Sequence, residues 1–183
     1  MKYVGLSLLC ALLCVTLAQD ATAEADLGFK GAGGRLSLVF PDNIDTAIGF
    51  GGLVELGTIT PDVTLGATLD LWFSSESTVD IRDIIFAANS KYHFTVKNKK
   101  LKPYAGGGLA IHIVNVDVPS TTVGTITVPG ASDSDVKIGL DLLGGLGYEV
   151  SPKVDITGEL MYRIVSDVSQ LVISGGIIYW FGK

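Results

Sequence analysis

The chain has 183 residues and a formal net charge of -6, with 17% charged residues and a mean hydropathy of +0.46. This length suits one domain, and the acidic balance, with a single basic cluster at 97–102, argues against a nucleic-acid-binding surface. The only cysteines are Cys10 and Cys14. Both lie within the first 23 residues, so residues 24–183 have no disulfide framework, no thiol nucleophile and no thiolate metal site.

The first 23 residues predict a secretory signal peptide. Lys2 precedes an apolar run at 4–18, and Ala21-Thr22-Ala23 is an A-x-A cleavage site. The apolar run is too short for a membrane anchor helix. We expect Sec-type export through the periplasm and a mature domain of residues 24–183, with a cut after Ala18 as the alternative.

Apolar and small or polar residues alternate along most of the mature chain. The clearest stretch is 136–165, where large apolar residues at even positions face charged or small residues at odd positions. Such a repeat predicts strands, because a 3.6-residue helical repeat would spread both sets around the axis. The strands are long enough to cross a bilayer at a tilt. We expect them near 28–40, 44–58, 63–74, 81–96, 102–117, 136–150, 153–166 and 170–181.

The connections between these strands alternate in character. Tight turns are expected at 60–62, 98–100 and 151–153, and the other set lies at 41–43, 74–80, 118–135 and 167–170. This predicts an all-β fold, an eight-stranded antiparallel up-and-down transmembrane β-barrel with periplasmic turns and outer loops. The longest loop, 118–135, is expected to be flexible and solvated, and an adhesin or receptor role for it stays open.

Composition indicates which stripe faces outward. A soluble lipocalin-like barrel would show the same alternation with its apolar stripe inside. Here the polar stripe is rich in glycine, which a narrow lumen accommodates, whereas the apolar stripe is too bulky for that lumen. We therefore expect the large residues to face lipid. Outward parity also predicts interfacial aromatics, namely Tyr92, Phe94, Tyr148, Tyr162, Tyr179 and Phe181, whereas Trp72 and Trp180 have lumenal parity.

Three segments carry a family resemblance: GLGYEVSPKVDITGELMYRIV at 145–165, KPYAGGGLAIH at 102–112 and LVISGGIIYWF at 171–181. With them the chain resembles the small outer-membrane β-barrel proteins, meaning the OmpA-type transmembrane domain and its OmpW-like relatives. The resemblance implies the outer membrane of a Gram-negative bacterium, a porin-like architecture and insertion by the barrel-assembly machinery. It also implies an assembly signal in the last strand, here followed by Gly182-Lys183: Leu171, Ile173, Ile177, Tyr179 and Phe181.

No arrangement of residues singles out catalytic chemistry. The two histidines, His93 and His112, are expected over about 20 Å apart in adjacent strands, which excludes a shared metal or proton relay. Barrel enzymes that trim lipid A use histidine, serine and an acid, and Ser74, Ser75, Glu76 and His112 supply those types without a distinctive spacing. We expect no enzyme, cofactor or metal, with a lipid-modifying enzyme as one alternative.

Lumenal ion pairs are the main expected site. With the turn at 151–153 and odd positions facing inward, Asp141 lies opposite Arg163, and Lys137 and Glu159 share their face. Glu55 and Lys91 have the same inward parity on the second and fourth strands. Such pairs would plug the barrel, which predicts a structural or membrane-integrity role with at most minor conductance. The alternative is OmpW-like transport of small apolar molecules.

The expected partners are outer-membrane lipid and lipopolysaccharide, and the oligomeric state stays open. An acidic rim would reach lipopolysaccharide phosphates through divalent cations, because direct contact between like charges is repulsive, and solvated loops that bind nothing are the alternative. Its expected members are Asp42, Asp45, Glu76, Asp80, Asp83, Asp117, Asp133, Asp135 and Asp167.

Overall fold

The computed structural model describes residues 25–42, 44–76, 79–118, 120–123, 126–128, 130–166 and 169–181. The expected signal peptide and its cleavage site lie outside these residues, as does Asp167. Within the described chain, no helix is long and apolar enough to cross a membrane.

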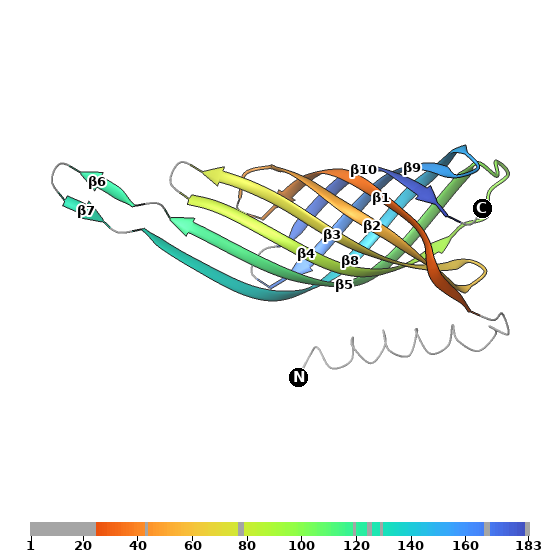
Figure 1. Ribbon diagram of the computed structural model, residues 1–183, viewed down its shortest axis with the longest axis horizontal. Helices are drawn as coiled ribbons and strands as arrows, with labels where there is room; N and C mark the ends of the chain where they lie inside the picture. The colour runs from red at the N-terminus through yellow and green to blue at the C-terminus, as the bar shows by residue number, and fades with distance from the viewer. Residues whose placement is uncertain are drawn as a thin grey trace.

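Eight strands of the described chain close into one barrel, in the order β1-β10-β9-β8-β5-β4-β3-β2 (Figure 1). All neighbours are antiparallel, and β1 pairs with β10 to close the ring. The predicted eight-stranded antiparallel barrel is confirmed. The strands are β1 (Asp26–Pro41), β2 (Ala47–Thr60), β3 (Val63–Glu76), β4 (Val79–His93), β5 (Leu101–Val118), β8 (Ala131–Ser151), β9 (Val154–Val165) and β10 (Gln170–Trp180).

The two ends of the barrel differ. The turns after β2, β4 and β8 lie at one end of the barrel, here called the turn end. The start of β1 and the end of β10 lie there too (Figure 1). The opposite end, the loop end, carries the connections at 42–46, 77–78, 119–130 and 166–169. The connections follow the predicted order, but their lengths differ: the turn after β4 spans 94–100, whereas the loop expected at 74–80 shortens to 77–78 because β3 and β4 extend farther than predicted.

The longest connection differs from its predicted form. Residues 118–135 were expected to be a flexible loop, but β8 already begins at Ala131, and a hairpin of β6 (Thr121–Val123) and β7 (Ile126–Val128) lies between. Alternating Thr and Val residues favour extended structure in this segment. The result is that β3, β4, β5 and β8 extend past the rest of the barrel, with β4 paired to β5 as far as Asp117, and the β6–β7 hairpin lies beyond them (Figure 1).

Large apolar side chains cover the outside of the barrel. Ile138, Ile48 and Leu36 are 72%, 69% and 68% exposed, although each lies within a paired strand. A water-soluble barrel would bury such residues, so this surface suits lipid contact. The six aromatics with outward parity are all exposed, whereas Trp72 is buried inside.

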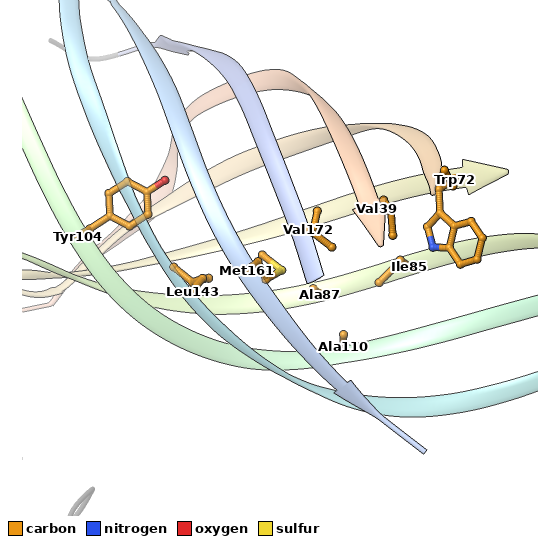
Figure 2. Packing of buried hydrophobic residues seen from close by; sticks show 10 residues of the cluster. Val39, Trp72, Ile85, Ala87, Tyr104, Ala110, Leu143, Met161 and Val172 are labelled. Atoms are coloured by element: carbon orange, nitrogen blue, oxygen red, sulfur yellow. The ribbon is translucent and has the colours of Figure 1, made fainter. Parts of the chain in front are cut away.

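Apolar and charged side chains both occupy the lumen. Toward the loop end, buried apolar side chains from several strands gather in a cluster that includes Trp72, Ile85 and Met161 (Figure 2). Glycines bring neighbouring strands close to the polar groups: a Cβ added to Gly108 would overlap the carbonyl oxygen of Ala88 and the side chain of Asn89. Charged side chains occupy the middle of the lumen.

Candidate functional site

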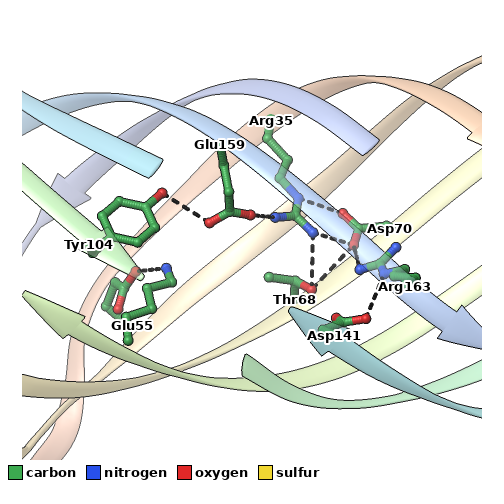
Figure 3. A network of polar contacts seen from close by, with 9 residues as sticks. Arg35, Glu55, Thr68, Asp70, Tyr104, Asp141, Glu159 and Arg163 are labelled. Atoms are coloured by element: carbon green, nitrogen blue, oxygen red, sulfur yellow. Dashed lines mark hydrogen bonds and ion pairs between the residues drawn. The ribbon is translucent and has the colours of Figure 1, made fainter. Parts of the chain in front are cut away.

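The main polar feature of the lumen is a group of six side chains, here called the central network: Arg35, Asp70, Tyr104, Asp141, Glu159 and Arg163 (Figure 3). Each has inward parity on its strand, and they come from β1, β3, β5, β8 and β9. All are less than 9% exposed. Because strands at different positions in the ring contribute them, the network crosses the lumen.

Arg163 joins two carboxylates. The β8–β9 register places Asp141 directly opposite Arg163, and Arg163 Nε donates to Asp141 Oδ1 at 3.1 Å. Its terminal nitrogen donates to Asp70 Oδ2 at 3.0 Å. Arg163 is only 2% exposed, so its charge is compensated by protein carboxylates and not by bulk water.

Arg35 makes a second bridge that shares Asp70. Its guanidinium donates to both carboxylate oxygens of Asp70, with Nε to Oδ1 at 2.7 Å. It also donates to Glu159 Oε1 at 3.0 Å, and Tyr104 donates its hydroxyl to Glu159 Oε2 at 2.9 Å. The two-pronged contact uses the planar fork of arginine, which matches a carboxylate.

A separate pair lies toward the turn end. Lys91 Nζ donates to Glu55 Oε1 at 2.9 Å, although β2 and β4 are separated by β3. The intervening strand places Gly66 opposite Glu55, and a Cβ there would lie only 3.3 Å from Glu55 Oε2. The missing side chain leaves room for the pair to form across β3.

Two of the sequence-predicted site residues do not meet. Glu159 belongs to the central network, whereas the ammonium of Lys137 lies 3.8 Å from Asp135. Arg35, Asp70 and Tyr104 were not predicted as site residues. Their inward parity among small residues was a signal, but their partners lie across the lumen on strands that are not hairpin neighbours.

A second polar group, here called the outer cluster, lies near the loop end and consists of Asp83, His112, Gln170 and Trp72. His112 Nδ1 lies 2.8 Å from Asp83 Oδ2, and Gln170 donates to the same oxygen at 3.1 Å. The other polar atoms of these four side chains have no partner within the described structure: Trp72 Nε1, Asp83 Oδ1, His112 Nε2 and Gln170 Oε1.

The outer cluster corrects one prediction. Asp83 was expected in the exposed acidic rim, but its side chain is buried in the lumen, because position 83 has inward parity and the barrel wall still surrounds it there. His112 is also fully buried, in agreement with the lumenal interpretation of that histidine. Its orienting acid is Asp83, and Ser74 is buried on the lumenal side of β3.

At the turn end, the lumen widens. Lys102 bridges Asp155 at 2.8 Å and Glu149 at 3.1 Å, and the Trp180 indole donates to the same Asp155 oxygen at 2.9 Å. A cavity of about 360 Å³ opens beside Trp180 and Lys30. The central network adjoins a cavity of only about 20 Å³.

No group of three or more metal-ligating side chains occurs among the described residues. The histidines lie apart in the register, because His93 pairs with Tyr104 and His112 with Ile85. The side chains of Ser75 and Glu76, two of the residues considered for a serine–acid–histidine site, fall outside the described part.

Residues 6–181 match the family model described as outer membrane protein beta-barrel domain. The chain belongs to this family. The search of curated proteins found no match. Membership in the family implies a location in the bacterial outer membrane.

Solved structures share the fold of this outer-membrane barrel. Neisserial surface protein A is 23% identical with a TM-score of 0.64, over 87% of this chain and 100% of that one. Ail of Yersinia pestis is 17% identical with a TM-score of 0.56, over 84% and 97%. The N-terminal barrel domain of Pseudomonas aeruginosa OprF is 15% identical with a TM-score of 0.56, over 84% and 99%. At these identities the likeness shows the fold alone.

Proposed function

We propose that this outer-membrane barrel is sealed and serves membrane integrity, with at most minor conductance. The observation that carries the proposal is the central network. Two arginines hold three carboxylates across the lumen, and each of the five charged side chains is less than 9% exposed. An eight-stranded barrel has a lumen just wide enough for side chains to fill, so a cross-lumen network obstructs it.

The space beside the network supports this interpretation. The adjoining cavity of about 20 Å³ is lined by Arg35, Tyr104, Glu159 and neighbouring residues. About one water molecule fits in such a volume. A hydrated ion would have to displace arginine–carboxylate bonds to pass this level, and breaking a buried pair is costly.

The transport alternative requires an apolar passage. The apolar side chains toward the loop end include Val39, Ile85 and Met161, which are 3%, 0% and 1% exposed. Side chains buried to this degree fill the lumen and do not line an open path. The sealed barrel is therefore the function that the arrangement favours.

The proposal includes no catalytic role. His112 is 0% exposed, so a substrate has no access to this histidine, which Asp83 orients. The proposed partners are outer-membrane lipid and lipopolysaccharide, the latter held by divalent cations at the acidic rim without Asp83. The assembly machinery is proposed to recognise the last strand, where Leu171, Ile173, Ile177, Tyr179 and Phe181 all face outward and are exposed.

Conductance tests the sealed barrel. The chain without its first 23 residues would be refolded and inserted into planar bilayers, as the wild type and as Arg163→Ala. We expect the wild type to show little or no steady current. Arg163→Ala strands Asp141 and is expected to lose about 3–5 kcal/mol of unfolding free energy and to gain conductance.

Arg82→Ala is the matched control, because Arg82 is exposed on the outer side of β4 and makes no ion pair within the described chain. It should change neither quantity by much, as is usual for surface substitutions. Steady current through the wild type, with neither stability nor current altered in Arg163→Ala, would contradict the sealed barrel and favour transport.

A further inference from the structure

The two rims of the barrel carry opposite charge (Figure 1). At the rim of the loop end, the cations of the described chain are Arg82 and Lys137, and carboxylates outnumber them: Asp42, Asp45, Asp80, Asp117, Asp133 and Asp135. At the turn end the balance is reversed. Four exposed lysines lie on its turns and are here called the basic edge: Lys97, Lys99, Lys100 and Lys153.

The basic edge spans two turns that touch. Three of its lysines lie in the turn between β4 and β5, and the fourth lies in the turn between β8 and β9. Because β5 and β8 are neighbours in the barrel, these turns are adjacent, and the Glu149 N–H donates to the Lys100 carbonyl at 2.9 Å. Within the first turn, the N–H of Lys100 donates to Asn98 Oδ1 at 3.1 Å, and the N–H of Leu101 donates to the Asn98 carbonyl at 3.0 Å. The backbone therefore holds the lysines in a defined arrangement.

The positive charge of the basic edge is not cancelled by nearby acids. None of its four lysines makes an ion pair or a side-chain hydrogen bond within the described chain. The neighbouring carboxylates are mostly compensated by other lysines, in the pairs Lys30–Asp26, Lys91–Glu55, Lys102–Glu149 and Lys102–Asp155. In the part of the turn end that the structure describes, Asp62 is the exposed acid outside these pairs. The edge thus keeps a net positive charge toward any ligand.

Outward-facing aromatic rings lie directly beneath the basic edge on the barrel wall. Phe29 stacks on Phe181 with ring centroids 5.0 Å apart, and Tyr92 meets Phe94 edge to face at 5.2 Å. The exposed rings at this end are Phe29, Tyr92, Phe94, Tyr148, Tyr179 and Phe181. Aromatic girdles of this kind lie at the boundary between the hydrocarbon and the head groups of a bilayer.

The distance from this girdle places the lysines among lipid head groups. Leu101 pairs with Tyr148, and Lys100 is the next residue, whereas Lys97 follows Phe94 by three residues. At about 3.3 Å per residue, the lysine backbones lie roughly 3–10 Å beyond the rings. The head-group layer on each side of a bilayer is about 5–7 Å thick. Lysine stems also extend along apolar surface while the ammonium stays in a polar layer. The ammonium groups therefore lie at the depth of the lipid phosphates.

We propose that the basic edge binds the head group of an anionic phospholipid, such as phosphatidylglycerol, in the leaflet around the turn end. The ammonium groups pair with the lipid phosphate, and the acyl chains lie against the aromatic rings beneath. The carboxylates of the opposite rim repel the same lipid. This specifies the lipid partner proposed above. It rests on the membrane location and not on the sealed lumen, so a conducting barrel would leave it standing.

NMR in nanodiscs tests the lipid assignment. The refolded barrel would be placed in phosphatidylcholine discs with increasing mole fractions of phosphatidylglycerol. We expect the amides of 97–100 and 153 to shift and saturate, and those of 133–135 at the loop end to stay unchanged. Both faces of a disc contain the lipid, so this difference reports the charge of the rims. Raising the salt from about 0.1 M to about 1 M should weaken the response, because the Debye length falls from about 10 Å to about 3 Å.

Matched variants test the role of the lysines. K97Q/K99Q/K100Q/K153Q should weaken the apparent affinity for phosphatidylglycerol by at least about 10-fold, since each lysine near an anionic surface contributes about 5-fold. K97R/K99R/K100R/K153R keeps the charge at the same positions and should stay within about 2-fold of the wild type. Arg82→Gln removes an exposed cation from the loop end and should leave the affinity unchanged.

Three outcomes would overturn the proposal. Equal shifts at the two rims would mean that phosphatidylglycerol changes the whole disc and does not bind the basic edge. Unchanged affinity in the glutamine variant would mean that the lysines take no part. The same shifts on adding glycerol phosphate, or a soluble peptidoglycan fragment, to phosphatidylcholine discs would mean that the edge recognises a soluble anion and not a lipid.

Discussion

The central network and the outer cluster are both buried polar groups inside the same barrel, but they differ in how completely they are paired. In the central network, Asp70 accepts a hydrogen bond from Arg35 on each oxygen and a third from Arg163, and Asp141 Oδ2 is the one buried polar side-chain atom without a partner in the described structure. In the outer cluster, one oxygen of Asp83 takes both His112 and Gln170, and its other oxygen has no partner in the described structure.

The difference lies in the donors. Arginine stays charged and can only donate hydrogen bonds. Removing the charge of its carboxylate partner therefore leaves a buried positive charge without its counter-charge. Neutral histidine can move its proton between its two ring nitrogens, and a glutamine amide can turn over. The central network is therefore fixed by its chemistry, whereas the outer cluster can rearrange its hydrogen bonds.

Replacing an aspartate by asparagine in each group, Asp70→Asn and Asp83→Asn, should give the largest difference in unfolding free energy. Asp70→Asn keeps the size of the side chain but removes the charge that Arg35 and Arg163 share. We expect a loss of about 3–5 kcal/mol in unfolding free energy, since two buried guanidinium groups lose a partner. Urea unfolding of the refolded barrel in lipid vesicles measures it. Asp62→Asn, in an exposed turn, should cost little, and an equally small loss for Asp70→Asn would refute the fixed network.

A single hydrogen bond at the edge of the central network should matter less. Tyr104→Phe removes the hydroxyl that donates to Glu159 and leaves Glu159 with Arg35. Hydrogen bonds to charged groups contribute about 1.5–3 kcal/mol, so the same unfolding measurement should show a loss in that range. Tyr162→Phe is the control, because that ring faces outward and is 44% exposed. If the two variants lose the same amount, the Tyr104 bond adds nothing specific.

The smallest loss is expected in the outer cluster. In Asp83→Asn, the new amide can donate to His112 Nδ1 once the histidine proton moves to Nε2, which has no other partner to lose in the described chain. We expect about 1 kcal/mol in the unfolding measurement, the size of one ordinary hydrogen bond. NMR of the ring nitrogens should report the change of tautomer. A loss as large as that of Asp70→Asn would erase the distinction between the two groups.

The fold was predictable because alternation is a local property. Every described barrel strand shows the predicted period, and the turn at 151–153 alone set Asp141 opposite Arg163, a register that the structure also has. Hairpin partners follow from counting residues on either side of a tight turn. The strand starts were harder: β8 begins five residues before its expected start, because the turn-like segment Ala-Ser-Asp-Ser-Asp at 131–135 pairs with the apolar end of β5.

The cross-lumen contacts were not predictable in the same way. Arg35 and Glu159 belong to strands on either side of β10, and Asp70 lies on β3, two strands from β1 on the other side. Their heights along the barrel depend on strand tilt and stagger, which no single turn determines. Parity placed these residues in the lumen without telling which of them meet.

The position of Arg35 has a consequence for the order of folding. It lies on β1, at the seam where the first and last strands pair, and its partners Asp70 and Glu159 stand on opposite sides of that seam. Pairing between β1 and β10 joins residues more than a hundred positions apart, and such long-range contacts form late. Arg35 can satisfy both carboxylates only once the ring has closed. An open intermediate leaves at least one of these charges unmatched. The ion pairs therefore stabilise the barrel only at the last step of closure, and incompletely closed barrels are short-lived.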